Sequence, residues 1–422
     1  MQFVSFGGVF VMLAICVGLS RDRKAIRWRL VGVGLLLQAV LGLVFLSWDA
    51  GNAALQACGR GVDAFLNLSR DGTYFVFGEL TNYGTMDALF PGADNGLLFA
   101  FMVLPTLIFF SSFMAVLYHL GVMQLVVRGM AWVTVRVLGT SGSESLSACA
   151  NVFVGQTEAP LLVRPFLARM TTSELFTVMV GGFATIAGSV FALYVGFVGG
   201  NDPEQRAVVA GHLMVASVMA VPAGLVCSKI LWPETETSET LGRVERTERS
   251  PYGSVVEAAA AGAGDGLKLA LNVGAMLIAF LGLVAVMNAC LQWVSEDWSI
   301  QGLLSGVFYP VAAVMGVPAA EIGTLSELIG TKLVLTELVA FKELGDMKAA
   351  GEVSPRTALI ASFALCGFAN VGSVAIQVGG MGAMAPDRRG DLAKLGLRAM
   401  FAGALATCMT ACVAGVLAAG GA

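Results

Sequence analysis

The sequence predicts an all-α polytopic membrane protein, with about eight transmembrane helices and two re-entrant helical hairpins in inverted repeats. The first observation is composition: the 422 residues are 57% hydrophobic and 13% charged, whereas soluble domains are about one quarter charged. The second is a set of apolar runs long enough to cross a bilayer. The third is a short signature that occurs twice, each time after an acidic residue in an apolar stretch.

Eight apolar runs approach the ~20 residues that a helix needs to cross a hydrocarbon core of ~30 Å. They cover about 3–19, 30–47, 97–121, 173–198, 206–231, 267–293, 356–384 and 395–419. Two further stretches, about 141–170 and 319–347, are apolar but carry polar and charged residues in their middles. We expect re-entrant hairpins there, because irregular backbone is tolerated in a membrane only where it packs on protein or lines a cavity. Amphipathic stretches at about 52–69, 123–138 and 299–315 predict interfacial helices.

Basic residues set the predicted orientation, because cytoplasmic loops are enriched in Lys and Arg. The loop from Arg21 to Arg29 and the segment from Arg388 to Arg398 are rich in basic residues, whereas the region between the second and third runs is mostly acidic. Both termini are therefore predicted on the external side, and the polar loop at 233–250 on the cytoplasmic side. The two hairpins would then enter from opposite sides, as an inverted repeat requires.

This pattern divides the chain into a predicted scaffold and a predicted moving unit. The scaffold comprises 1–96, 97–138 and 267–317, each with spans and an interfacial helix. The moving unit comprises the hairpin repeats at 139–232 and 318–385. A polar loop with an interfacial segment occupies 233–266, and a C-terminal span occupies 386–422. The net charge of −4 argues against a nucleic-acid partner.

The duplicated signature carries the functional argument. Glu158 precedes Gly182-Phe-Ala-Thr-Ile-Ala-Gly-Ser-Val190, and Glu337 precedes Gly367-Phe-Ala-Asn-Val-Gly-Ser-Val374. A carboxylate within hydrocarbon is costly, so it usually marks a solute or ion pathway. We expect both acidic side chains to be shielded from water and to face a common central cavity.

Several motifs give the chain a family resemblance. The segments Gly155-Gln-Thr-Glu-Ala-Pro-Leu-Leu-Val163, Ala364-Leu-Cys-Gly-Phe-Ala-Asn370 and Ala385-Pro-Asp-Arg-Arg389 closely resemble those of the concentrative nucleoside transporters. The second hairpin, Gly330-Thr-Lys-Leu-Val-Leu-Thr-Glu-Leu-Val-Ala-Phe341, fits with one departure, because Thr336 stands where the family usually has Asn. The resemblance runs from about residue 97 to 419, with motifs in matching order.

The resemblance implies a set of substrate-binding residues. Gln156, Thr157 and Glu158 would bind the nucleobase, since together they offer donors and acceptors. Glu337 would accept from ribose hydroxyls. The remaining implied residues are Asn370 and Ser373 at the ribose, Phe368 against the ring or sugar, and Val190 as an apolar wall. The competing interpretations are a hairpin held by its own polar tip, and a salt bridge from Glu337 to Lys332.

The resemblance also implies a sodium site. Asn151 and Thr185 would supply side-chain oxygens, and Val154 and Ile186 would supply backbone carbonyls where helices break. The alternative is proton coupling through Glu158 or Glu337, because desolvation raises the pKa of a carboxyl group. Interhelical hydrogen bonding is the structural alternative for the Asn and Thr side chains.

The implied function is secondary active import of nucleosides such as uridine, cytidine and adenosine. Sodium symport with alternating access would drive it, in a homotrimer in the inner (plasma) membrane, with no cofactor beyond the coupling Na⁺, or H⁺ in the alternative. An intramembrane enzyme using the two glutamates as acid and base, or a passive channel, remains a competing class. The enzyme interpretation lacks an obvious nucleophile or metal set.

Overall fold

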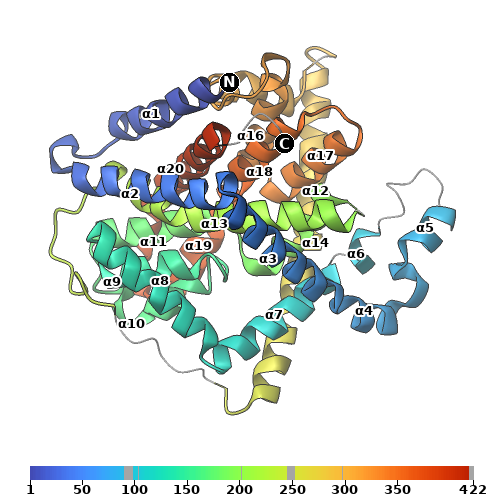
Figure 1. Cartoon of the computed structure of the whole chain (residues 1–422), viewed down its shortest axis with the longest axis horizontal. Coiled ribbons are helices and arrows are strands. Elements are labelled where there is room, and N and C mark those ends of the chain that lie inside the picture. The colour runs from blue at the N-terminus through green and yellow to red at the C-terminus, as the bar shows by residue number, and fades with distance from the viewer. Residues whose placement is uncertain (90–97, 103, 201, 245–251, 297, 418–422) are drawn as a thin grey trace.

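The computed structural model describes residues 1–422 except 90–97, 103, 201, 245–251, 297 and 418–422. Helices make up nearly all regular structure in this described part (Figure 1). The first half contains α1 (Gln2–Gly18), α2 (Trp28–Gly42), α3 (Asp49–Asn67), α4 (Ser69–Phe77), α5 (Tyr83–Leu89), α6 (Phe99–Met102), α7 (Leu104–His119), α8 (Val122–Leu138), α9 (Gly142–Ala150), α10 (Arg164–Leu167), α11 (Thr172–Ala184) and α12 (Gly188–Gly199). The second half contains α13 (Pro203–Leu231), α14 (Val255–Gln292), α15 (Ile300–Ala313), α16 (Ile322–Val334), α17 (Glu337–Ala349), α18 (Pro355–Leu365), α19 (Val371–Met384) and α20 (Arg389–Leu417).

Five helical segments of the described chain are long and apolar enough to cross a membrane. They are Trp28–Ser47, Phe99–His119, Pro203–Leu231, Val255–Gln292 and Pro386–Leu417. The first predicted run forms α1, which is apolar but has 17 residues. The all-α polytopic fold with several apolar helices is therefore as predicted.

The other two predicted runs, 173–198 and 356–384, are not continuous helices. The first is interrupted between the end of α11 at Ala184 and the start of α12 at Gly188. The second is interrupted between Leu365 of α18 and Val371 of α19. Hydropathy did not separate the halves, because most of the interrupting residues are small or apolar and only Thr185 and Asn370 are polar.

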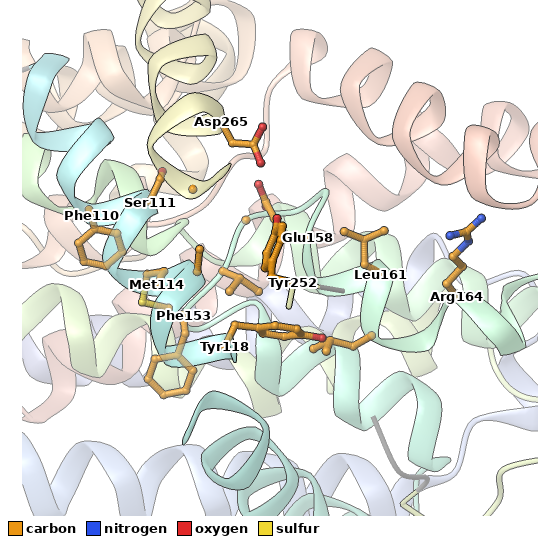
Figure 2. A pocket seen from close by; sticks show the side chains of 15 residues that line it. Phe110, Ser111, Met114, Tyr118, Phe153, Glu158, Leu161, Arg164, Tyr252 and Asp265 are labelled. Atoms are coloured by element: carbon orange, nitrogen blue, oxygen red, sulfur yellow. The ribbon is translucent and has the colours of Figure 1, made fainter. Parts of the chain in front are cut away.

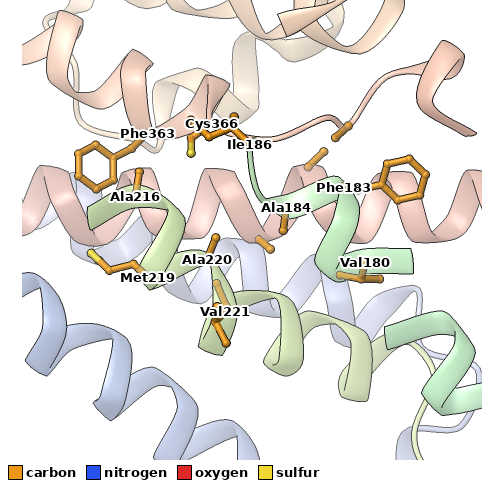
Figure 3. Packing of buried hydrophobic residues seen from close by; sticks show 14 of the residues in the cluster. Val180, Phe183, Ala184, Ile186, Ala216, Met219, Ala220, Val221, Phe363 and Cys366 are labelled. Atoms are coloured by element: carbon orange, nitrogen blue, oxygen red, sulfur yellow. The ribbon is translucent and has the colours of Figure 1, made fainter. Parts of the chain in front are cut away.

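The two breaks pack against each other. Gly367 has φ +138°, and a Cβ atom there would lie 2.6 Å from the carbonyl oxygen of Phe183, so only glycine fits this position. Ile186 and Cys366, one from each break, lie in the same buried cluster (Figure 3). The duplicated signature thus provides the contact at which the two repeats meet.

The two predicted hairpins differ in regularity. Hairpin 1 (residues 142–167) consists of α9, a turn region, a short 3-10 helix at Ala159–Val163, and α10. Hairpin 2 (residues 322–349) consists of two full helices, α16 and α17, joined at Leu335 and Thr336.

Burial separates inner from outer helices. The most apolar windows of α13 and of the α20 segment are 78% and 83% buried, whereas those of the α7 and α14 segments are 12% buried. The exposed apolar surface of α7 and α14 is suited to lipid or to another protein surface. The centre of the core lies around α11, α13, α18 and α20, which pack together.

The helix α14 is longer than predicted. The sequence predicted a span starting at residue 267, but the helix begins at Val255, where Ser254 accepts from Glu257 N at 3.1 Å as an N-cap. The alanine-rich stretch before Asp265 favours helix, which extends the span. The predicted interfacial stretches form α3, α8 and α15.

The described part of the polar loop, residues 233–244, packs back on hairpin 1 rather than remaining a solvated connection. The amide of Gly142 donates to the carbonyl of Thr240 at 2.9 Å. Near the start of hairpin 1, Lys229 Nζ lies 2.6 Å from Glu144 Oε2, and both side chains are almost fully buried. A buried ion pair therefore ties the end of α13 to the start of hairpin 1.

Candidate functional site

The helix α19 lies between the two hairpins and bonds to both. Its N-cap, Asn370, accepts from Ser373 N at 2.7 Å and donates Nδ2 to Glu337 Oε2 of hairpin 2 at 2.8 Å. Seven residues later, Gln377 donates Nε2 to Gln156 Oε1 of hairpin 1 at 3.0 Å. A rise of 1.5 Å per residue separates these contacts by roughly 10 Å along the helix. One helix thus holds polar side chains of both hairpins.

Glu337 is buried at the first position of α17, with 4% of its surface exposed. Besides Asn370, the hydroxyl of Tyr194 donates to Glu337 Oε1 at 3.0 Å. The Tyr194 ring stacks on Phe341 with the ring centroids 4.3 Å apart, which fixes the hydroxyl. The positive end of the α17 dipole further favours a carboxylate here. Each carboxylate oxygen has one partner and keeps a lone pair for another donor.

Thr336, which replaces the usual Asn, is the N-cap of α17. Its Oγ1 accepts from Val339 N at 3.4 Å. Asn and Thr both serve as N-caps, so the substitution keeps the local function of holding the start of α17. The position of Glu337 is therefore supported despite the departure from the family pattern.

The alternative partner for Glu337, Lys332, bonds elsewhere. Its Nζ donates to Ala364 O at 2.9 Å and to Thr407 Oγ1 at 3.0 Å. Within the described residues, Lys332 and Glu337 form no ion pair. Lys332 instead ties hairpin 2 to the C-terminal end of α18 and to α20.

The tip of hairpin 1 packs on α19 and α11. Gln156 is 8% exposed. Thr157 lies over Gly380, where a Cβ atom would be 3.3 Å from Thr157 Cγ2. A Cβ atom on Gly182 would lie 2.6 Å from Gln377 Nε2 and 2.9 Å from Gln156 Cβ, so this glycine makes room for the amide pair.

Glu158 does not share the burial predicted for it. Its side chain is exposed and lines a cavity of about 400 Å³ between hairpin 1 and the outer helices α7 and α14 (Figure 2). Asp265 of α14 and Arg164 of α10 line the same cavity. Glu337 is buried and is not among its lining residues, so the expectation that both carboxylates are shielded from water is wrong for Glu158. The reason is local: residues 156–158 form turns at the tip of hairpin 1, and Glu158 lines the cavity beside α7 and α14.

The predicted ion ligands lie where hairpin 1 meets the first break. Asn151 is 1% exposed and donates Nδ2 to Ser147 O at 3.0 Å, while its Oδ1 is buried without a hydrogen-bond partner in the described structure. A Cβ atom on Gly181 would lie 3.3 Å from Asn151 Nδ2, which places Asn151 against the last turn of α11. Thr185 Oγ1 donates to Gly181 O at 2.9 Å. The side chains of Asn151 and Thr185 therefore both contact Gly181.

Backbone contacts complete this region. The amide of Gly188 donates to Phe153 O at 3.2 Å, joining the turns of hairpin 1 to the start of α12. Val154 follows directly and lines the cavity, and Ile186 lies in the break with 1% of its surface exposed. Val190 is buried on the first turn of α12, and Phe368 is partly buried in the second break.

Comparison with known proteins identifies the family. The profile described as "Na+ dependent nucleoside transporter C-terminus" matches residues 212–415, and the corresponding N-terminus profile matches residues 7–80. A profile described as "Gate: Nucleoside recognition" matches residues 100–201. An uncharacterized transporter of Haemophilus influenzae is 43% identical over 97% of this chain and 96% of its own length. The chain belongs to the Na⁺-dependent nucleoside transporter family.

Other relatives extend this assignment. The mouse sodium/nucleoside cotransporter 1 is 43% identical over 99% of this chain, which spans 64% of the length of that relative. The inward-facing substrate-bound structure of CNTnw superimposes with a TM-score of 0.91 at 43% identity, covering 99% of this chain and 98% of that chain. A substituted CNTnw in an outward-facing state gives a TM-score of 0.92 with the same coverages. Members of this family are transporters, so the prediction that the chain is not an enzyme is confirmed.

Two residues that contact the transporter's candidate site escaped the sequence analysis. Tyr194 and Gln377 each bond a residue assigned to substrate binding, namely Glu337 and Gln156. Each is a hydrogen-bonding side chain within an otherwise apolar helix, and that isolation was the available signal. Asp265 was missed because the predicted apolar run, 267–293, began after it, whereas α14 begins at Val255.

Proposed function

We propose that this transporter imports nucleosides such as uridine, cytidine and adenosine by Na⁺ symport with alternating access. The observation that carries the proposal is the distance along α19 between two hydrogen bonds. One joins Asn370 at its N-terminal end to Glu337, and the other joins Gln377, two turns further on, to Gln156. The roughly 10 Å between these contacts is about the length of a nucleoside. A ligand with a sugar at one end and a base at the other can therefore engage both hairpins.

The ribose end is proposed at Glu337. A carboxylate only accepts hydrogen bonds, and vicinal hydroxyls are a pair of donors. Tyr194 and Asn370 hold the carboxylate in place before the sugar arrives, so little ordering remains to be done on binding. Ser373 lies on the same face of α19 as Asn370, and Phe368 precedes them in the break.

The base end is proposed at the tip of hairpin 1. Gln156 and Thr157 pack against α19, and Val190 belongs to the first turn of α12. Glu158 lines the adjacent cavity, where it is available to a base or to water between the base and the protein.

Sodium is favoured as the coupling ion by the orphaned oxygen of Asn151. A buried acceptor without a partner requires an explanation, and a bound cation supplies one. Na⁺ takes oxygen ligands, which Asn151, Thr185, and the carbonyls of Val154 and Ile186 would provide. The proton alternative rests on the two glutamates. Glu158 is the weaker candidate for it, because its side chain is exposed.

The transport cycle is proposed as movement of the two hairpin repeats relative to the outer helices α7 and α14. The related CNTnw has been resolved in inward-facing, outward-facing and intermediate states. We further propose that the protein is a homotrimer in the plasma (inner) membrane with both termini outside. These assignments follow from the family and from the charge pattern of the loops.

Uptake into proteoliposomes tests the proposal. Labelled uridine and adenosine are supplied with an inward Na⁺ gradient, with choline in place of Na⁺, and with a pH step in choline. We expect accumulation above equilibrium with the Na⁺ gradient alone. Accumulation driven by the pH step in choline would refute sodium coupling, and uptake that stops at equilibrium under every gradient would indicate a channel.

A further inference from the structure

We propose that Gln377 sets the base preference of the transporter by fixing the orientation of the Gln156 amide. With this orientation, Gln156 presents its NH₂ group to the base and favours a carbonyl over an amino group at the position it meets. The inference rests on the proposed function, in which Gln156 contacts the base. Gln377 acts through Gln156 and is a positioning residue.

The orientation follows from a backbone carbonyl whose hydrogen-bonding role is unambiguous. Gln377 is 1% exposed, and its Nε2 lies 3.2 Å from Met179 O and 3.0 Å from Gln156 Oε1. A backbone carbonyl only accepts, so the group of Gln377 that faces Met179 must be its NH₂. The same NH₂ faces Gln156, so the atom of Gln156 that meets it must be the amide oxygen.

The donor of Gln156 is left for a ligand. Its Oε1 is occupied by Gln377, and its Nε2 makes no hydrogen bond within the described residues. Turning the Gln156 amide over would place two NH₂ groups against each other, and turning Gln377 over would place its oxygen against Met179 O. Both alternatives lose hydrogen bonds in a buried site, where that loss is large.

Two features argue that this amide pair is more than core packing. Gly182 leaves the space that the pair needs, since a Cβ atom there would lie 2.6 Å from Gln377 Nε2. Gln377 Oε1 is buried without a partner in the described structure, a loss that an apolar side chain at this position would avoid. A role in orienting Gln156 accounts for keeping glutamine at this position.

The consequence is a preference among bases. Uracil and cytosine have nearly the same shape, but uracil carries a carbonyl at position 4 where cytosine carries an amino group. The proposal places position 4 of the pyrimidine at Gln156, where its NH₂ group bonds the uracil carbonyl and opposes the cytosine amino group. We therefore expect the unmodified transporter to prefer uridine to cytidine.

The experiment compares initial uptake of trace labelled uridine and cytidine in the same proteoliposomes, with an inward Na⁺ gradient. The uridine-to-cytidine ratio cancels differences in the amount of active protein. In Gln377→Leu, Gln156 is free to turn, and the ratio should fall toward one by about three- to tenfold. In Gln377→Glu, whether ionised or donating its hydroxyl to Met179 O, an acceptor faces Gln156, so the amide turns over and the ratio should fall below one.

Gln38→Leu is the matched control. Gln38 is a buried glutamine that donates Nε2 to Thr410 Oγ1 at 2.8 Å and has a partnerless Oε1, but it lies on α2 outside the site. Its replacement should leave the ratio unchanged. Equal shifts in Gln38→Leu and Gln377→Leu would overturn the proposal, because a general loss of packing would then explain both.

Other outcomes separate this inference from the proposed function. If the unmodified protein takes up neither nucleoside with Na⁺, the proposed function fails and the inference fails with it. If it transports uridine with Na⁺ but prefers cytidine, or keeps its ratio within twofold in both Gln377 variants, only the inference fails. Should both Gln377 variants fail to fold, Gln156→Glu decides: its free carboxylate oxygen should favour cytidine, and a retained uridine preference overturns the inference.

Discussion

The two hairpins carry the same kind of motif but use it differently. In hairpin 2, α17 starts directly at Glu337, and Thr336, Tyr194 and Asn370 hold that residue in a buried position. In hairpin 1, the chain after Gln156 forms turns and a short 3-10 helix, and Glu158 is exposed to a cavity. A second full helix after the tip is what distinguishes a fixed carboxylate from a free one.

The difference also appears in how each hairpin is anchored. Hairpin 1 is tied at its base by an ion pair between Lys229 and Glu144, with Glu234 of the loop 3.6 Å from the same amine. Hairpin 2 is anchored by Lys332 through neutral acceptors, Ala364 O and Thr407. Hairpin 1 therefore depends on buried charge pairing for its attachment, and hairpin 2 on hydrogen bonds.

The largest expected effect comes from breaking the anchor of hairpin 1. Lys229→Met leaves the carboxylate of Glu144 buried without its cation, which should lower the stability by about 3–5 kcal/mol. Thermal unfolding of the detergent-solubilised protein measures this. Adding Glu144→Gln should recover part of the loss, because the uncompensated charge is removed. A double variant no more stable than Lys229→Met would show that the pair is not coupled.

The next effect concerns the fixed carboxylate. Glu337→Gln replaces a charged acceptor with a neutral amide that clashes with one of its two donors, so the kcat/KM for uridine should fall about 10- to 100-fold. Uptake kinetics in proteoliposomes measure it. Tyr194→Phe removes one of the two orienting hydrogen bonds and should show a smaller fall.

Lys332→Met is the comparison for Glu337→Gln. It should lower thermal stability, because Ala364 O and Thr407 lose a buried donor, while uptake per folded protein changes less than threefold. Equal losses of uptake in Lys332→Met and Glu337→Gln would instead favour a functional Lys332–Glu337 pair. The contrast tests whether the carboxylate is held for the substrate or for the lysine.

A smaller effect is expected at the proposed ion site beside hairpin 1. Asn151→Ala removes the orphaned oxygen, so the Na⁺ concentration for half-maximal uridine uptake should rise about tenfold, as expected for losing one strong ligand contact. Asn52→Ala, on α3 and away from the hairpins, is the control and should leave the Na⁺ dependence unchanged. An unchanged Na⁺ dependence in Asn151→Ala would remove this residue from the site.

The smallest effect tests the cap that positions Glu337. Thr336→Ala should lower stability by about 1 kcal/mol, because the first turn of α17 loses an acceptor. Thr336→Asn, which restores the residue usual in the family, should change the stability by only a few tenths of a kcal/mol relative to the unmodified chain. Thermal unfolding of the two variants side by side measures the difference. If Thr336→Asn is as unstable as Thr336→Ala, capping is not what this residue provides.

The sequence alone was sufficient for the features that depend on local composition. Apolar runs report segment length and polarity, so they located most of the apolar helices. Polar residues within two apolar stretches located the hairpins, with Gln156 and Glu337 at their tips. The motifs identified the family, because each lies within a short continuous stretch. The N-cap role of Thr336 also follows from local chemistry once the start of α17 is known.

Only the tertiary structure decided where helices break and which side chains meet. The break before Val371 depends on Gly367 packing against Phe183, which lies far away in sequence. The partners Tyr194 and Gln377 are joined to Glu337 and Gln156 across the two repeats, and the exposure of Glu158 depends on how hairpin 1 turns toward α14. Hydropathy averages over one segment, whereas a hydrogen bond between repeats is set by the packing of several segments at once.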